Sequence, residues 1–122
     1  MRVVIADDDD DIRALVEIAV RRQGFDVVAE VADGAHAWAA IQTLRPDLAV
    51  LDWAMPGMSG LEVCRRTRSH PELHGIRLVL LTAAADRAAE ERGRAAGADE
   101  YVIKPFTLPA LAQAMVADGS AG

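Results

Sequence analysis

The stretch that decides the fold is Leu48–Gly60, with the sequence LAVLDWAMPGMSG. Four apolar residues lead directly into a carboxylate at Asp52, and a turn-forming segment that contains Pro and Gly follows. An apolar run with no polar alternation is typical of a strand that is covered on both faces, as in a parallel sheet. The flanking sequence must therefore supply further strands and the helices that cover them.

Short strand-like runs alternate along the chain with segments of helical spacing. The expected strands are Arg2–Ala6, Asp26–Val31, Leu48–Leu51, Arg77–Leu81 and Tyr101–Ile103. The expected helices are Asp11–Gln23, Gly34–Leu44, a segment from Ser59 or Gly60 to Ser69, Asp86–Ala96 and Thr107–Ala117. This alternation predicts an α/β fold, a doubly wound five-stranded parallel sheet of the flavodoxin-like (βα)5 kind with strand order 2-1-3-4-5. The second and fifth runs carry more polar residues and suit the edges.

Composition limits the classes of protein to which the chain can belong. It has 122 residues, of which 52% are hydrophobic, and 13 basic against 19 acidic side chains give a net charge of −6. This is the size of one domain, and an acidic surface disfavours direct contact with nucleic acid or anionic lipid. Cys64 is the only cysteine, so no disulfide framework exists. No signal peptide and no membrane-spanning run is present, which predicts a soluble cytoplasmic domain.

The domain is expected to span residues 1–117. Residues 118–122, DGSAG, have the composition of a flexible tail or of the start of a linker. Such a linker would join the domain to an output domain beyond residue 122.

Polar residues follow four of the expected strands at the point where each strand ends. Asp7 and Asp8 follow the first strand, Asp52 the third, Thr82 the fourth and Lys104 the fifth. Because a doubly wound sheet binds its ligand at the carboxyl ends of its strands, these side chains are expected to meet. Crowded carboxylates repel one another unless a cation lies among them, and hard oxygen ligands suit Mg²⁺. With Asp52 as a carboxylate nucleophile, the set predicts metal-assisted phosphoryl transfer.

Four motifs then carry a resemblance to a known family. They are Ile5–Asp9 (IADDD), Leu51–Gly60 (LDWAMPGMSG), Leu81–Ala83 (LTA) and Gly97–Phe106 (GADEYVIKPF). In this order, each at the end of the right strand, they resemble the receiver domain of two-component response regulators, and the match runs from about Arg2 to Ala117. An acidic pair alone would be weak evidence, whereas four ordered motifs are specific.

The resemblance implies that Asp52 is the phosphoacceptor. It would receive the phosphoryl group from the phosphohistidine of a sensor histidine kinase or a histidine phosphotransfer protein. It further implies that Mg²⁺, or Mn²⁺ in its place, is bound by Asp8, Asp52 and the backbone carbonyl of Ala54, with Asp7 acting through water. Such a domain phosphorylates and dephosphorylates itself and is not a turnover enzyme.

The remaining roles are implied by the same resemblance. Lys104, the Thr82 hydroxyl and the Ala83 N–H would hold phosphoryl oxygens, and the Lys104–Pro105 bond matches a position where the family commonly has a cis peptide. Thr82 and Tyr101 would form a switch that alters the face made by the fourth helix, fifth strand and fifth helix, a face suited to homodimer formation. An aromatic residue on an edge strand, such as Tyr101, is also typical of ordinary half-buried packing.

Other interpretations of these residues stay open at this level. The run Asp7–Asp11 is also typical of a helix N-terminus, and for Asp9, Asp10 and Asp11 we expect that role. A phosphatase of the haloacid-dehalogenase type, with Asp7 as nucleophile, also uses a strand-end carboxylate, Mg²⁺, a hydroxyl and a lysine. Against it, Asp11 stands where Thr or Val is usual, and no acidic pair follows a strand beyond Lys104. A flavodoxin is disfavoured because the aspartates would repel the FMN phosphate.

Overall fold

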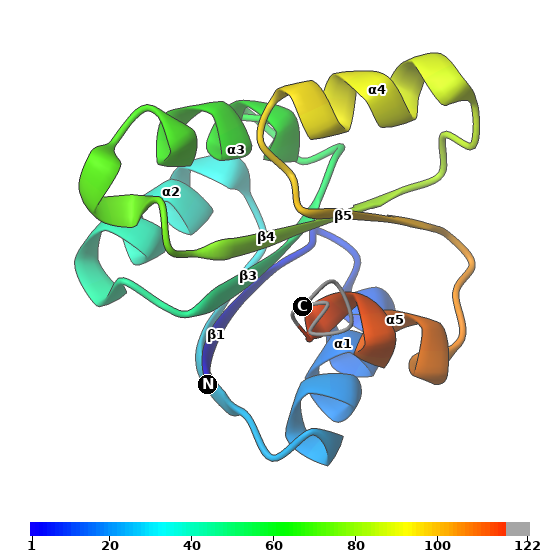
Figure 1. The fold of residues 1–122 in the computed structure, drawn as a ribbon. Helices are drawn as coiled ribbons and strands as arrows, with labels where there is room; N and C mark the ends of the chain where they lie inside the picture. Colours follow the sequence, from blue (N-terminus) through cyan, green and yellow to red (C-terminus); the bar gives the residue numbers. More distant parts are fainter. Residues whose placement is uncertain (117–122) are drawn as a thin grey trace, which may run out of the picture.

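Strands and helices alternate in the order that the sequence predicts (Figure 1). The structure is a computed structural model, and it describes residues 1–116. Its elements are β1 (Arg2–Ala6), α1 (Asp10–Arg22), β2 (Asp26–Val31), α2 (Gly34–Leu44), β3 (Leu48–Asp52), α3 (Gly60–Arg68), a 3-10 turn (Pro71–Leu73), β4 (Arg77–Thr82), α4 (Arg87–Ala95), β5 (Glu100–Ile103) and α5 (Leu108–Met115). All strand pairs are parallel, and the sheet order is β2-β1-β3-β4-β5. The predicted fold class and strand order are confirmed.

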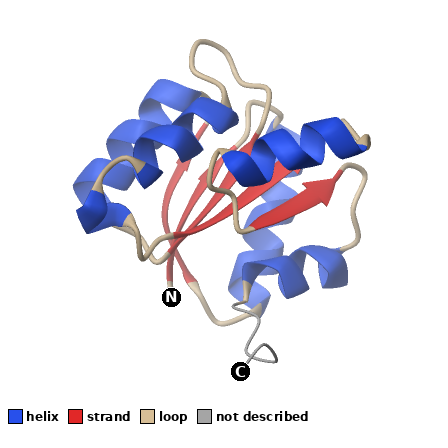
Figure 2. Cartoon of the chain, turned by 45° about the horizontal axis from the view of Figure 1, so that its top comes forward, coloured by secondary structure: helices blue, strands red, loops and turns tan. Residues whose placement is uncertain are grey.

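Helices cover both faces of the sheet, with α1 and α5 on one face and α2, α3 and α4 on the other (Figure 1, Figure 2). Alternate residues of each central strand enter two separate cores because successive side chains of a strand point to opposite faces. Thus Val3 and Ile5 pack with α1 and α5, whereas Val4 and Ala6 pack with α2 and α3. The strands β1, β3 and β4 are almost wholly buried, while β2 and β5 are edge strands with partly exposed residues, as expected.

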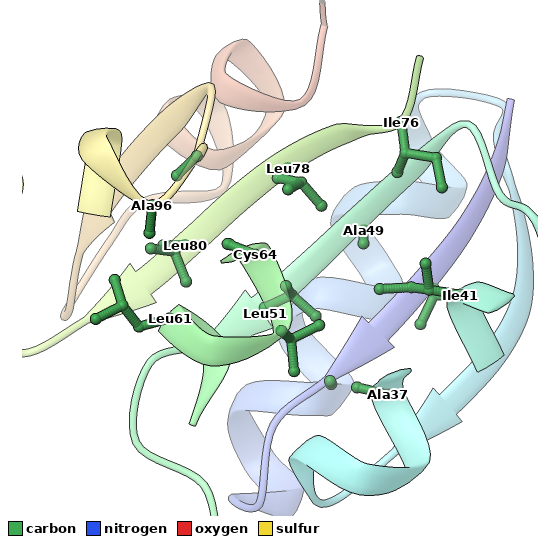
Figure 3. Packing of buried hydrophobic residues seen from close by; sticks show 14 of the residues in the cluster. Ala37, Ile41, Ala49, Leu51, Leu61, Cys64, Ile76, Leu78, Leu80 and Ala96 are labelled. Carbon is green, nitrogen blue, oxygen red and sulfur yellow. The ribbon is translucent and has the colours of Figure 1, made fainter. Parts of the chain in front are cut away.

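The core under α2 and α3 shows how these helices are fixed on the sheet. Ile41 of α2, Cys64 of α3, Leu51 of β3 and Leu80 of β4 belong to one cluster of buried apolar side chains (Figure 3). Each large apolar side chain that is fully buried in this way contributes about 1.5–3 kcal/mol. Burial raises the pKa of the Cys64 thiol to about 12, so this residue serves as a small apolar side chain rather than a reactive thiolate.

Strand and helix ends differ slightly from the sequence-based expectation. β3 and β4 each run one residue further, to Asp52 and Thr82, because the ladder continues in the pairs Asp52↔Leu81 and Thr82↔Ile103. Helices begin after a capping side chain that accepts a backbone N–H, and these caps are Asp9, Asp33, Ser59, Asp86 and Thr107. The expected start of the first helix at Asp11 is therefore one residue late, since Asp9 caps a helix that begins at Asp10.

One further expectation concerns the C-terminal end, and one connection contains an element that the sequence pattern does not predict. α5 ends at Met115, whereas the expected end at Ala117 and the expected tail at residues 118–122 lie outside the described residues. A 3-10 turn at Pro71–Leu73 begins at the proline and lies between α3 and β4. Proline is favoured there because its fixed φ suits the first position of a helical turn and its missing N–H is not needed.

Gly60 fixes the distance between α3 and the end of β3. A Cβ on Gly60 would lie 2.2 Å from the backbone oxygen of Asp52, which is closer than real side chains approach backbone. The Gly60 N–H also donates to the Trp53 carbonyl at 2.8 Å. The helix start is thus seated directly on the backbone that carries Asp52, and only glycine leaves the room for this contact.

We expect Gly60→Ala to lower the free energy of unfolding by about 1–3 kcal/mol, because the added methyl group must displace backbone. Chemical denaturation followed by far-UV circular dichroism measures this change. The matched control is Gly75→Ala, since a Cβ at Gly75 meets nothing within 4 Å. Its stability should stay within about 0.5 kcal/mol of the parent. Equal losses in the two variants would contradict the close approach at Gly60.

Candidate functional site

An acidic cluster lies at the carboxyl ends of β1 and β3. Carboxylate oxygens of Asp7, Asp8 and Asp52 all lie within 4.8 Å of one another. Asp7 has no exposed surface and Asp52 is 5% exposed, while Asp8 is exposed. The three side chains that the sequence analysis assigned to the metal are thus brought together by the topology of the sheet.

Lys104 brings a positive charge into this cluster from the segment after β5. Its Nζ donates to Asp7 Oδ2 and to Asp52 Oδ1, both at 3.1 Å. Its backbone N–H donates to the Thr82 carbonyl at 2.7 Å, which extends the pairing of β5 with β4 by one step. The following Lys104–Pro105 peptide bond is cis. One ammonium group therefore spans the carboxylates at the ends of β1 and β3.

The single lysine does not balance the negative charge around it. The pKa of Asp52 is raised to about 6, chiefly because the carboxyl is buried; the bond from Lys104 lowers this pKa, and the charge of Asp7 raises it. Burial by itself would lower the pKa of Lys104, but its bonds to Asp52 and Asp7 outweigh this, and the pKa is raised. The shifts reflect a partly desolvated Asp52 beside a second carboxylate, and a Lys104 ammonium that its two carboxylate partners stabilise. The site can accommodate additional positive charge.

The donor set fits a hard divalent cation. Three carboxylates supply oxygen atoms, and Ala54 lies with Asp8 and Asp52 along the same open cleft. Mg²⁺ prefers oxygen ligands and is usually held by one or two carboxylates, with room left for water and phosphate. The chemistry of these residues therefore agrees with the metal that the sequence analysis expected.

The end of β4 supplies hydroxyl and amide groups to the cleft. Thr82 is 5% exposed, and its Oγ1 accepts the Ala84 N–H at 3.0 Å. Ala83 lies beside it along the cleft. The Tyr101 hydroxyl donates to the Ala84 carbonyl, so Ala84 joins the strand-end hydroxyl to the aromatic residue of β5. Tyr101 itself is half-buried.

Asp9, Asp10 and Asp11 serve the N-terminus of α1, as expected. Asp9 is the cap, accepting the Asp11 and Ile12 N–H groups at 2.9 and 3.1 Å, and Asp10 and Asp11 lie in the first turn. The side chain of Asp7 accepts the Asp9 N–H at 2.9 Å, which fixes the loop between β1 and α1.

Three residues of this region were not identified by the sequence analysis. Arg13 donates to the Asp7 carbonyl at 2.7 Å and to Asp10 at 2.6 Å. Trp53 and Arg92 line the cleft, and the Arg92 guanidinium lies 5.4 Å from the centre of the Trp53 ring. The place of Trp53 directly after the strand-end carboxylate was a usable signal. Nothing in the sequence distinguishes Arg92 from the other arginines of α4, because only the placement of the helix brings it to the cleft.

Comparisons with known proteins identify the family to which the sequence and the fold are similar. The family model described as the response regulator receiver domain matches residues 3–116. The phosphate regulon transcriptional regulatory protein PhoB of Rhizobium meliloti is 37% identical over 110 residues, which are 90% of this chain and 48% of that protein. The DNA-binding response regulator MtrA of Mycolicibacterium smegmatis is 42% identical over 105 residues, 86% of this chain and 44% of that protein. This chain thus spans less than half the length of these relatives.

The solved structures show the same likeness in three dimensions. The signal receiver domain of the response regulator NarL from Mycobacterium tuberculosis superposes with a TM-score of 0.86 at 36% sequence identity. The match covers 93% of this chain and 90% of that one.

Among residues 1–116, none of the helices has the length and apolar character that a membrane-spanning segment requires.

These matches do not favour the haloacid-dehalogenase alternative. The geometry also disfavours Asp7 as a nucleophile, because its carboxylate is fully buried and bonded to Lys104 and to the Asp9 N–H. The fold, the ordered strand-end residues and the family match over nearly all of the chain lead to one assignment. The chain belongs to the response-regulator receiver-domain family of two-component signalling.

Proposed function

We propose that this receiver domain takes a phosphoryl group onto Asp52 from the phosphohistidine of a sensor histidine kinase or a histidine phosphotransfer protein. The observation that carries the proposal is the position of Asp52. It is the carboxylate that contacts Lys104, belongs to the acidic cluster and lines the open cleft. A donor that enters the cleft meets Asp52, whereas Asp7 does not line the cleft and has no exposed surface.

The chemistry proceeds by attack of an Asp52 carboxylate oxygen on phosphorus. A P–O bond forms, the P–N bond to the imidazole breaks, and the imidazole leaves with the electron pair and takes up a proton. Lys104 then pairs with a phosphoryl oxygen, since the acyl phosphate keeps negative charge where the carboxylate was. The Thr82 hydroxyl and the Ala83 N–H hold the other oxygens. Stabilising charge at fixed positions is the main contribution a protein makes to phosphoryl transfer.

Asp8, Asp52 and the Ala54 carbonyl would hold Mg²⁺, with Asp7 acting through water, and Mn²⁺ would substitute. When bound, the ion supplies positive charge that neutralises the phosphoryl oxygens. The excess of negative charge in the cluster supports this assignment.

Asp52 is expected to be the single phosphorylation site. Incubation of the protein with Mg²⁺ and acetyl phosphate should add the mass of one phosphoryl group, measured by intact-protein mass spectrometry. The label should be lost on treatment with hydroxylamine, because an acyl phosphate is labile to this nucleophile. Asp52→Asn should remain unlabelled. The matched control is Asp26→Asn, an exposed carboxylate on β2, which should label like the parent. A label that persists in Asp52→Asn would show that the site is elsewhere.

Metal binding is expected to depend on Asp8 and not on Asp10. Mg²⁺ at 100 times its dissociation constant should raise the free energy of unfolding of the parent by about 2.7 kcal/mol, because it binds the folded state. Asp8→Asn should lose most of this gain, as it removes a carboxylate of the cluster. Asp10→Asn is the control, since Asp10 is 87% exposed and pairs with Arg13 at 2.6 Å. Thermal unfolding with and without Mg²⁺ measures both, and equal losses would exclude the assigned role of Asp8.

We further propose that phosphorylation is transmitted to the face formed by α4, β5 and α5. The Thr82 hydroxyl, drawn to the phosphoryl group, would give up its bond from the Ala84 N–H. The Ala84 carbonyl holds the Tyr101 hydroxyl, so a shift of this loop changes the surroundings of Tyr101 on β5. The altered face would form a homodimer.

We also propose an output domain beyond residue 122. The names of the longer relatives, a transcriptional regulatory protein and a DNA-binding response regulator, support it.

Thr82→Ala should still accept phosphate on Asp52 but transmit little of the signal. Beryllofluoride with Mg²⁺ mimics the phosphoryl group, and in the parent it should shift amide resonances across α4 and β5. In Thr82→Ala these distant shifts should fall to less than about a third, because no hydroxyl joins the phosphoryl group to the Ala84 loop. Thr82→Ser, which keeps the hydroxyl, is the matched control and should restore them. A full set of shifts in Thr82→Ala would rule out the hydroxyl as the link.

A further inference from the structure

The cleft at Asp52 carries far more negative than positive charge. Its lining includes four carboxylates and two cations, namely Asp8, Asp9, Asp52, Asp86, Arg92 and Lys104. Any phosphodonor is an anion, so the carboxylates repel it as it approaches. The ammonium of Lys104 is shared between Asp7 and Asp52 before a donor arrives, and the Mg²⁺ of the proposed function would be held by carboxylates of the same cluster. Arg92 is the remaining cation of the cleft lining.

Arg92 forms no ion pair with any carboxylate of residues 1–116. Arg94 on the same helix differs, since it pairs with Glu90 at 3.1 Å and with Glu100 at 3.6 Å. The Arg92 guanidinium instead lies over the indole of Trp53, 5.4 Å from the ring centre. A cation–π contact holds an arginine in place while leaving its N–H groups free to bind an anion.

Trp53, whose indole lies under the Arg92 guanidinium, is itself held in place by its neighbours. The backbone N–H of Trp53 donates to the Leu81 carbonyl at 2.8 Å, and the backbone carbonyl of Trp53 accepts the Gly60 N–H at 2.8 Å. The ring of Tyr101 meets the indole edge-on, with the ring centres 6.2 Å apart. A Cβ at Gly93 would lie 3.5 Å from the indole and 3.3 Å from the tyrosine ring, so α4 rests against both aromatic rings. Arg92 is thereby held in a preorganised position at the cleft.

We infer that Arg92 is a specificity-determining residue that recruits doubly charged, low-molecular-weight acyl phosphates to Asp52 in preference to singly charged donors. This inference rests on the proposed function of Asp52 as the phosphoacceptor. For acetyl phosphate, an Asp52 oxygen forms the new P–O bond, the bond from phosphorus to the bridging oxygen breaks, and acetate leaves with the electron pair. For phosphoramidate the P–N bond breaks, and ammonia leaves with protons it already carries. At neutral pH the first donor carries two negative charges and the second carries one net negative charge.

Charge alone sets the size of the expected effect. A unit charge about 8 Å away in water changes the rate constant for a dianion about fivefold and for a monoanion about twofold. Arg92→Gln should therefore lower the second-order rate of labelling by acetyl phosphate about fivefold and by phosphoramidate about twofold. At high ionic strength, where the Debye length is about 3 Å at 1 M salt, both differences from the parent should disappear.

The experiment measures initial labelling rates of the intact protein by mass spectrometry, with Mg²⁺ and each donor at low and at high salt. Arg87→Gln is the matched control, because Arg87 is an exposed arginine at the start of the same helix that does not line the cleft. It should label like the parent with both donors. Arg92→Lys should recover most of the acetyl phosphate rate, since the charge is retained.

Several results would overturn the inference. Equal losses with the two donors, a loss in Arg92→Gln that is unchanged at high salt, or the same loss in Arg87→Gln would each show that Arg92 does not select donors by charge. An unchanged rate in Arg92→Gln would do the same. Failure of the parent to label, or labelling that survives Asp52→Asn, would instead refute the proposed function of Asp52. The two failures are therefore distinguishable.

Discussion

The contact of the Lys104 ammonium with Asp7 and Asp52 is the interaction on which the functional end of the molecule depends. It joins the segment after β5 to the end of β3, from which β5 is separated by β4, and to the end of β1, from which β5 is separated by both β3 and β4. Removing one partner of a buried charge pair is costly because the other charge is left without compensation. The lysine therefore allows two buried carboxylates to stand side by side at the edge of an apolar sheet.

The single positive charge of Lys104 does not neutralise the carboxylates of the cluster. Asp52 keeps a raised pKa in spite of the lysine, and Asp8 adds a third carboxylate at the exposed side of the cluster. A structure selected only for stability would not gather these groups, since like charges in a desolvated place oppose folding. Functional sites are where proteins depart from local stability rules, and the excess negative charge here suits a site that gains a cation.

The sheet makes this arrangement possible by being rigid and apolar behind the site. β1, β3 and β4 are buried on both faces, and their last residues or the residues directly after them are Asp7, Asp52 and Thr82. Groups built on strand ends are held more firmly than groups on long loops. The N-terminus of α3 is locked to the same backbone through Gly60, whereas α4 meets the site through the rings of Trp53 and Tyr101. One side of the site is therefore formed by the strand ends and the start of α3, and the other side is formed by α4, which packs on two aromatic rings.

The sequence by itself determined the alternation of strands and helices, the sheet order and the strand-end residues Asp8, Asp52 and Lys104. These follow from local apolar runs and from the rule that parallel strands end at one edge, and the receiver resemblance added the roles. The tertiary structure decided features that no local pattern encodes. It brought Arg92 rather than Arg87 or Arg94 to the cleft, and it left Arg92 on Trp53 without an ion pair among the described residues. The physical reason is that the rotation of a helix about its own axis, and its distance from the sheet, are set by packing between residues far apart in the chain.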